Sequence, residues 1–394
     1  IRMRYLQKMR RFAALVCEPL RCNAPFFVFM YVLGCICAWA TLPDVRGAHL
    51  YKNLYPELFL DVYVLALVLT LLPRRVRPWV RGIFYFILYA VALVDVYCFV
   101  KFHSSLTPTM LLLVGETDSR EAGEFLRSCV SPDVLFSNVG WVVLVMFIHL
   151  LVALQLRFPH FVPKNWCRLF WSLLDRFGLM LKRVRPVSQL AVLILLVVSI
   201  QDSAHNKAAF VKLMSGRTIG EVEHTLTEKD KANLYQPIYR LVFSLYANTL
   251  TAKQVDRLVA RVDKARVDSC SFRSPNIVLI IGESYNRHHS AQYGYCMPTT
   301  PRQQKLEKQG RLVKYTDVVS PWNLTSFVFK HIFSLYTVGD KGEWCDYPLF
   351  PAVFRKAGYH VTFITNQFLP KAGEAVYDFS GGFFLNNPKL SAAQ

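Results

Sequence analysis

The carboxylate of Glu283 is the first side chain in this sequence whose position favours chemistry. It follows five apolar residues, Ile277 to Ile281, and a single glycine, Gly282. A short apolar run of this kind, preceded by Ser274-Pro275, predicts a fully buried parallel strand. Open α/β sheets bind ligands beyond the carboxyl ends of their strands, so an acid there can hold a metal ion or face a phosphate. The alternative interpretation is that Glu283 only caps a helix that starts near Ser284.

Thr325 is the second candidate. It follows Ser320-Pro321 and opens an apolar stretch that is predicted to be a helix. A hydroxyl at a helix amino terminus faces unpaired backbone N–H groups and the positive end of the helix dipole, which suits an acceptor of a phosphoryl group. A divalent metal shared with Glu283 would activate this hydroxyl as a nucleophile. The alternative is an N-cap threonine with no chemical role.

Three further polar side chains lie near these candidates. Asn366 follows a second predicted strand, 360–365, and could contact a substrate at the same edge of the sheet as Glu283. His288 and His289 suggest a metal site, but adjacent helical side chains point about 100° apart and rarely bind one ion. We therefore interpret the two histidines as part of a solvated loop.

The elements that would position these residues alternate between strand and helix. Strands are predicted at 275–281, 313–319 and 360–365, and helices at 301–310, 325–335 and 348–357. Such alternation favours a mainly parallel sheet covered by helices.

The first half of the chain has a different composition. The chain has 394 residues, of which 53% are hydrophobic, and a formal charge of +19. Five apolar runs approach the length that crosses a membrane. They are Pro25 to Leu42, Pro56 to Leu72, Val80 to Val100, Val134 to Leu156 and Val187 to Ile200.

Basic residues predict the orientation of these spans. They gather before the first run, between the second and third, and between the fourth and fifth. Since short cytoplasmic segments hold Lys and Arg in excess, these segments are predicted inside and everything after residue 201 outside. The positive charge follows the spans and is not clustered on a soluble surface, which argues against nucleic acid as a partner.

The outside loop 101–133 is predicted to contain an amphipathic helix. Thr107-Pro108 is a helix start, with threonine as N-cap and proline at the first helical position. Apolar and acidic residues follow to about Ser128, a pattern typical of a helix lying at the membrane surface. Thr117 and Glu121, four residues apart, share one face and are candidates for substrate binding. The alternative is a solvated acidic face.

Three domains follow from these patterns. Residues 1–201 form a transmembrane domain, 202–274 a helical connector and 275–394 part of a catalytic domain. The connector is predicted to contain a helix over 232–246, interrupted by Pro237, and a second helix over 251–268.

The run Asn276 to Pro301, with VVSPWNLTSF after it, resembles the catalytic opening of bacterial phosphoethanolamine transferases, in the alkaline phosphatase and sulfatase superfamily. The matching motifs are Gly282-Glu283-Ser284, Gly294-Tyr295 and Thr299-Thr300-Pro301, with Thr325 at the family's distance from the glutamate. The resemblance implies five membrane spans followed by an alkaline-phosphatase-like α/β domain with a mainly parallel sheet. It also implies a multi-pass protein of the bacterial inner membrane with its catalytic domain in the periplasm.

The resemblance further implies a role for each candidate residue. Glu283 would be a Zn²⁺ ligand and Thr325 a zinc-bound nucleophile, which takes phosphoethanolamine from phosphatidylethanolamine and passes it to lipopolysaccharide, at a core sugar or lipid A. Thr117 and Glu121 match two of three lipid-contacting positions of the family. The third, an asparagine there, is Leu113 here.

The chain departs from the family at its carboxyl end. The family's later zinc-ligand motifs, Ser-Asp-His-Gly-Glu and Gly-Ser-His-Gly-Pro, are missing before Gln394. Zinc sites need three or four protein ligands, so the site in this chain is expected to be incomplete, as in a fragment or a degenerate member. The alternative functions are a phosphoglycerol transferase, a sulfatase-like hydrolase and a noncatalytic membrane protein.

Overall fold

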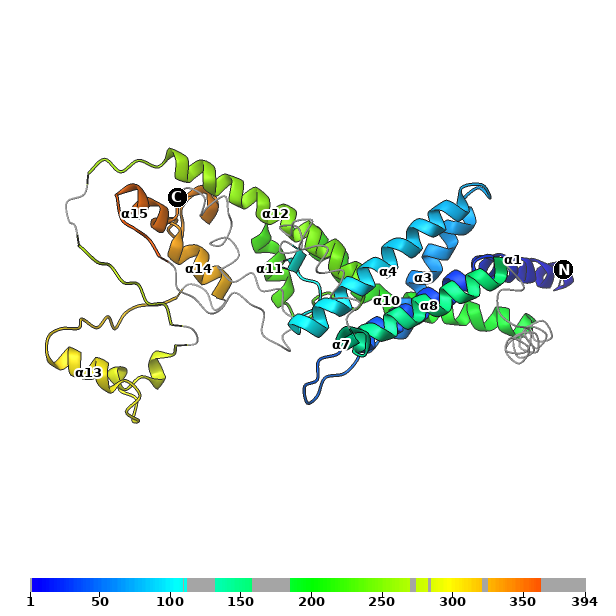
Figure 1. Cartoon of the computed structure of the whole chain (residues 1–394), viewed down its shortest axis with the longest axis horizontal. Helices are drawn as coiled ribbons and strands as arrows, with labels where there is room; N and C mark the ends of the chain where they lie inside the picture. The colour runs from blue at the N-terminus through cyan, green and yellow to red at the C-terminus, as the bar shows by residue number, and fades with distance from the viewer. Residues whose placement is uncertain are drawn as a thin grey trace. The chain divides into compact units, whose positions relative to one another are not determined.

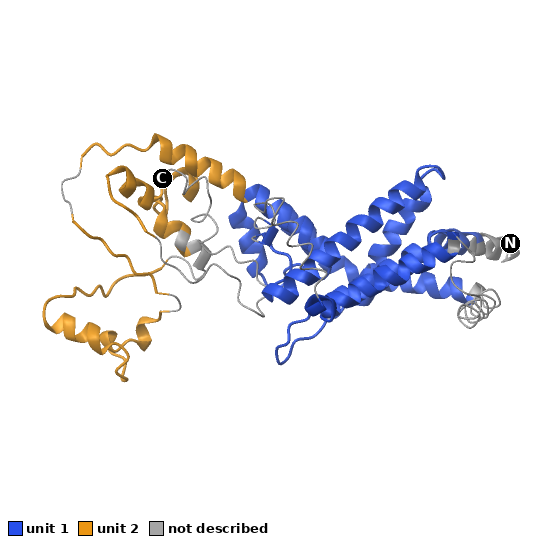
Figure 2. Ribbon diagram, in the orientation of Figure 1, with its two compact units in different colours: residues 1–250, 369–377 blue, residues 251–368, 378–394 orange. Residues whose placement is uncertain are grey.

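The structure is a computed structural model that describes residues 2–108, 110–111, 132–157, 185–269, 274–282, 285–320 and 325–362. Glu283, Thr117, Glu121 and Asn366 lie outside these residues. The chain divides into two compact units, with the division between Leu250 and Thr251 (Figure 2).

Long helices form most of the first unit (Figure 1). They are α1 (Arg2–Cys22), α2 (Ala24–Ala40), α3 (Leu54–Leu71), α4 (Arg77–Phe102), α8 (Asn138–Arg157) and α10 (Arg185–Met214), with the short α7 (Pro132–Leu135) before α8. The five predicted apolar runs coincide with α2, α3, α4, α8 and α10. The last of these helices continues past the predicted end of its span to Met214.

Among the described residues, 4 helices are long and apolar enough to cross a membrane. They are α3, α4, α8 and α10, which supports a membrane protein. A fifth span would be the pair formed by Arg11–Cys22 and α2, which is bent by 73°. The predicted number of five spans therefore remains a prediction.

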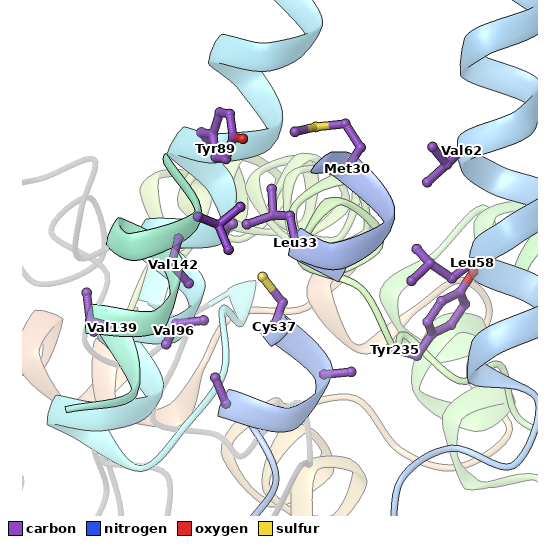
Figure 3. Packing of buried hydrophobic residues seen from close by; sticks show 14 of the residues in the cluster. Met30, Leu33, Cys37, Leu58, Val62, Tyr89, Val96, Val139, Val142 and Tyr235 are labelled. Atoms are coloured by element: carbon purple, nitrogen blue, oxygen red, sulfur yellow. The ribbon is translucent and has the colours of Figure 1, made fainter. Parts of the chain in front are cut away.

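The core of this unit lies where α2, α3, α4 and α8 meet. Met30, Leu33 and Cys37 of α2 face side chains of the other three helices, as Figure 3 shows. The facing residues are Leu58 and Val62 of α3, Tyr89 and Val96 of α4, and Val139 and Val142 of α8. Tyr235, from the segment before α12, packs against the same core.

Gly34 allows α2 to approach α3 and this segment closely. A Cβ atom at Gly34 would lie 2.6 Å from a methyl carbon of Leu58 and 3.0 Å from the side-chain oxygen of Gln236. The Gln236 amide also donates a hydrogen bond to the Gly34 carbonyl at 3.1 Å. A larger residue at position 34 would force these elements apart.

The connector contains α11 (Ile219–Thr227) and α12 (Pro237–Lys264). Thr218 caps α11, because its side chain accepts a hydrogen bond from the Glu221 N–H. The predicted break at Pro237 and the separate helix over 251–268 are wrong. Pro237 instead begins α12, where the missing N–H of proline costs no helical hydrogen bond, and the helix continues without a break to Lys264.

The second unit contains short helices joined by long loops. They are η1 (Arg287–His289), η2 (Ala291–Tyr293), α13 (Pro301–Lys308), α14 (Thr325–Phe333), η3 (Trp344–Asp346) and α15 (Phe350–Lys356). The predicted helices near 301–310, 325–335 and 348–357 are confirmed as α13, α14 and α15.

The predicted parallel sheet is not formed among the described residues. Their β pairing is limited to a single isolated bridge between Ser334 and Leu349. The apolar run that was predicted to be a buried strand is extended but exposed, with Val278 80% and Ile280 86% accessible. A central parallel strand needs a hydrogen-bonded neighbour on each side, and the described segments give this run none.

Candidate functional site

Thr325 is the first residue of α14, as predicted. The structure therefore agrees with a position at a helix amino terminus, where backbone N–H groups lack helical partners. Glu283, Asn366, Thr117 and Glu121 lie outside the described residues. Whether these side chains come together with Thr325 is not tested, so their roles remain predictions.

The end of α14 is fixed to the segment that precedes α15. The Ser334 hydroxyl donates a hydrogen bond to the Trp344 carbonyl at 2.7 Å, and the Leu335 N–H donates to the Pro348 carbonyl at 3.0 Å. Phe333 is buried in a cluster with Leu258 of α12 and with Cys345. These contacts anchor the carboxyl end of α14, the helix that begins with Thr325.

η3 is closed by a reciprocal cap and held by an arginine of α12. The Glu343 N–H donates to Asp346 Oδ2 at 3.0 Å, and the Asp346 N–H donates to the Glu343 carbonyl at 2.9 Å. Arg257 Nε donates to Asp346 Oδ1 at 3.1 Å, and its two terminal nitrogens pair with Glu343 and Asp346. Hydrogen bonds from Arg257 hold the pKa of Asp346 below its usual range.

The two threonines of the Thr299-Thr300 motif close the loop that follows the extended run. Thr299 Oγ1 donates to the His289 carbonyl at 2.7 Å and accepts from the Ala291 N–H at 3.0 Å. Thr300 Oγ1 accepts from the Gln292 N–H at 3.0 Å and lies 3.1 Å from the Ser290 hydroxyl, whose residue is only 1% exposed. Their visible role is therefore structural.

Gly294, from the Gly-Tyr motif, allows this loop to turn. Its φ of 97° lies in the left-handed region, which a side chain would strain. Tyr293, just before it, donates to the Tyr315 carbonyl at 3.1 Å. The motif residues thus define the shape of the loop that starts two residues after Glu283.

His288 and His289 are exposed in η1, in agreement with the predicted solvated loop. Among the described residues, no three His, Cys, Asp or Glu side chains lie together in an arrangement that could hold a metal ion. Neither Glu283 nor the side chain of Thr325 is among those residues. The fit of Zn²⁺ to its predicted ligands therefore remains untested.

The start of the predicted interfacial helix is part of a buried network in the first unit. Thr107 caps it, because Thr107 Oγ1 accepts from the Met110 N–H at 3.2 Å, and this confirms the predicted helix start. The next contacts upstream involve Asp95 of α4, whose Oδ1 accepts from the Leu106 N–H at 2.9 Å. The Asn248 side chain of α12 donates to the Pro108 carbonyl at 3.0 Å.

Sequence reasoning missed Asp95 and its partner, Arg240 of α12. Asp95 is fully buried and forms an ion pair with Arg240. The available signal was an acid inside the predicted span 80–100, because ionisable residues within apolar spans usually have a partner or a function.

Comparison with known proteins supports the resemblance. Residues 275–387 match the Sulfatase family model. The chain is 23% identical over 305 residues to phosphoethanolamine transferase CptA of Salmonella typhimurium strain LT2, an alignment that covers 75% of this chain and 47% of the relative. It is also 23% identical over 299 residues to phosphoethanolamine transferase EptC of Escherichia coli K12, with 75% and 47% coverage.

The chain therefore spans about half the length of these curated relatives, 47% in each case. No solved structure matches the chain. The resemblance to phosphoethanolamine transferases and to the sulfatase superfamily, which the motifs predicted, is confirmed.

Proposed function

We propose that the protein containing this chain transfers phosphoethanolamine from phosphatidylethanolamine to lipopolysaccharide, with Thr325 as the nucleophile. The observation that carries the proposal is the position of Thr325 as the first residue of α14, within a region that matches the Sulfatase model, in a chain similar to two phosphoethanolamine transferases. The basic segments predict that this region lies on the periplasmic side of the bacterial inner membrane.

The reaction would take place in two steps. The hydroxyl of Thr325 attacks the phosphorus of the donor lipid, the bond from phosphorus to the diacylglycerol oxygen breaks, and that oxygen takes up a proton. The resulting phosphoethanolamine-threonine ester is then attacked by a hydroxyl or phosphate of the acceptor, which regenerates the threonine. Backbone N–H groups at the start of α14 are suited to stabilise the negative charge on the phosphoryl oxygens in the transition state.

A bound Zn²⁺ would lower the pKa of the threonine hydroxyl and offset the charge of the phosphate. Glu283 is the proposed protein ligand beside Thr325. Thr117 and Glu121 on the predicted interfacial helix, and Asn366 in the second unit, are the proposed substrate contacts.

The experiment that tests this function measures the covalent intermediate. The full-length protein in detergent is incubated with phosphatidylethanolamine, and its intact mass is determined. We expect an adduct of the mass of phosphoethanolamine on the parent protein and none on Thr325→Ala. Thr325→Ser is the matched control, because it keeps the hydroxyl and should still form some adduct.

A sulfatase-superfamily match also permits a different headgroup. Phosphatidylglycerol offered in place of phosphatidylethanolamine separates the possibilities. An adduct formed only from phosphatidylglycerol would replace the proposal by a phosphoglycerol transferase. No adduct from either lipid would reject a threonine-bound intermediate and favour a noncatalytic protein.

A further inference from the structure

A second polar cluster lies in the first unit, apart from the network of Asp95. It consists of Glu57 and Asp61 on α3, Lys207 on α10, Tyr235 just before α12 and Tyr239 in the first turn of α12, and we call it the ammonium cluster. Lys207 Nζ lies 3.1 Å from Glu57 Oε1 and 2.7 Å from Asp61 Oδ1. Glu57 Oε1 also accepts a hydrogen bond from the Asn206 side chain at 2.8 Å.

The two tyrosines complete an environment that suits a positively charged amine. Lys207 Nζ lies 4.4 Å from the ring centroid of Tyr239 and 5.6 Å from that of Tyr235, distances at which cation–π attraction acts. Both tyrosine hydroxyls donate hydrogen bonds to Asp61 Oδ2, that of Tyr239 at 2.9 Å. The aromatic rings and the carboxylates thus surround the same ammonium group.

The cluster has one more negative charge than positive charge. Two carboxylates face one ammonium, and no second cationic side chain of the described residues forms an ion pair with either of them. The side chain of Glu57 is fully buried, and the Tyr51 hydroxyl approaches its carboxylate, whereas Oε2 has no partner of regular hydrogen-bond geometry among the described residues. Burial, and after it the charge of Glu57, raises the pKa of the nearby Tyr51 hydroxyl.

A buried carboxylate normally needs full pairing, because an uncompensated charge in an apolar region costs several kcal/mol. Asp61 and Lys207 form the accessible part of the cluster. The side chains of Lys207 and Asp61 are 29% and 23% exposed, whereas that of Glu57 is 0% exposed. A second cation would therefore approach from the side of Asp61 and Lys207.

We propose that the ammonium cluster binds a second primary ammonium group, that of the ethanolamine headgroup of phosphatidylethanolamine. Glu57 and Asp61 lie in the first half of α3, whose amino-terminal end is predicted to face the outer leaflet, where lipid headgroups are found. A primary ammonium donates hydrogen bonds to carboxylates, which a quaternary choline cannot do. The excess negative charge disfavours an anionic phosphatidylglycerol headgroup.

This inference rests on the proposed function for the choice of lipid, but it concerns a different set of residues. Thr117 and Glu121 belong to the predicted interfacial helix, whereas the ammonium cluster is formed by residues of α3, α10 and the segment that leads into α12. Binding here requires no reaction, so it can be measured separately from transfer.

The test measures which lipids stay bound to the full-length protein. The protein, carrying Thr325→Ala to prevent turnover, is placed in nanodiscs of equal parts phosphatidylethanolamine and phosphatidylcholine, and the lipids retained after extraction are identified by native mass spectrometry. We expect preferential retention of phosphatidylethanolamine. Asp61→Asn should lower the preference about tenfold, because a charge-assisted hydrogen bond is lost. Asp44→Asn, in an exposed loop before α3, is the matched control and should leave the preference unchanged.

Lys207→Met separates binding from a purely structural role. Removing the lysine ammonium makes the cluster more negative, so the preference for phosphatidylethanolamine should rise, whereas a cluster that only holds helices together would show no such rise. A preference that neither Asp61→Asn nor Lys207→Met changes would overturn the proposal, and water or a proton would then satisfy Glu57. Retention without any covalent adduct in the parent protein would reject the transfer reaction and leave the lipid site in place.

Discussion

Asp95 of α4 and Arg240 of α12 form a buried ion pair between residues 145 positions apart in the sequence. The pair is well satisfied, because Asp95 Oδ1 also accepts from the Leu106 N–H and Arg240 Nε donates to the Leu234 carbonyl at 2.9 Å. It therefore joins α4, α12 and the segment that leads to the predicted interfacial helix.

Arg240→Ala should destabilise the first unit strongly. The substitution leaves the Asp95 carboxylate buried without a counter-charge, which typically costs about 3–5 kcal/mol in the free energy of unfolding. Thermal unfolding in detergent, followed by size-exclusion chromatography, measures the effect. Arg46→Ala, at an exposed position, is the control and should have little effect. Pairing Arg240→Met with Asp95→Leu should recover much of the loss, and equal damage from the pair would contradict the electrostatic explanation.

The ion pair between Arg257 and Asp346 should make the second unit sensitive to acid. The pKa of Asp346 is lowered from its ordinary value of 3.8 in the folded protein, so its contribution to stability is present above that value and is lost as pH falls through the lower, folded-state pKa. Arg257→Met should therefore lower the free energy of unfolding at neutral pH. The loss should be at most about 1 kcal/mol, because solvent screens the partly exposed guanidinium.

The difference in unfolding midpoint between the parent and Arg257→Met should shrink as pH is lowered below 3.8, the ordinary pKa of the carboxyl. Lys253→Met, at an exposed position of the same helix, serves as the control. A difference that stays constant across this pH range would show that Arg257 acts through packing and not through the charge of Asp346.

The local elements of this fold could be predicted from sequence because their signals are local. The apolar runs gave α2, α3, α4, α8 and α10, and proline or threonine at a helix start gave α13 and α14. Pro237 was misread because proline marks the first turn of a helix as readily as a break. The sheet could not be established in this way, because pairing of parallel strands depends on segments far apart in the chain.

Some residues of interest could likewise be identified from the sequence, and others only from the structure. Thr325 and Glu283 stood out because they belong to motifs with a fixed spacing. Arg240 and Lys207 did not stand out, because their roles depend on ion pairs with residues of other helices, such as Asp95 and Glu57. An acid within an apolar span is a signal that some partner exists, but it does not identify which residue that is.

Thr300→Val should loosen the loop that follows Glu283. The substitution removes the acceptor of the Gln292 N–H and the partner of the buried Ser290 hydroxyl. Leaving such groups unpaired costs about 1–3 kcal/mol, so trypsin should cleave after the exposed Arg287 about tenfold faster. Thr300→Ser keeps the hydroxyl and should retain the slow rate. Equal cleavage of Thr300→Val and the parent would mean that these hydrogen bonds do not hold the loop.

Two cysteines of the second unit should differ sharply in their reaction with alkylating reagents. Cys345 is fully buried beside Phe333 and Leu349, and burial raises the pKa of its thiol to about 12. Since the thiolate is the reactive form, iodoacetamide at pH 8 should leave Cys345 unmodified while it labels the exposed Cys296. Mass spectrometry of the two tryptic peptides measures both reactions. In urea the two thiols should react equally, which controls for differences between the peptides. Rapid labelling of Cys345 without urea would show that the cluster that holds the end of α14 opens readily.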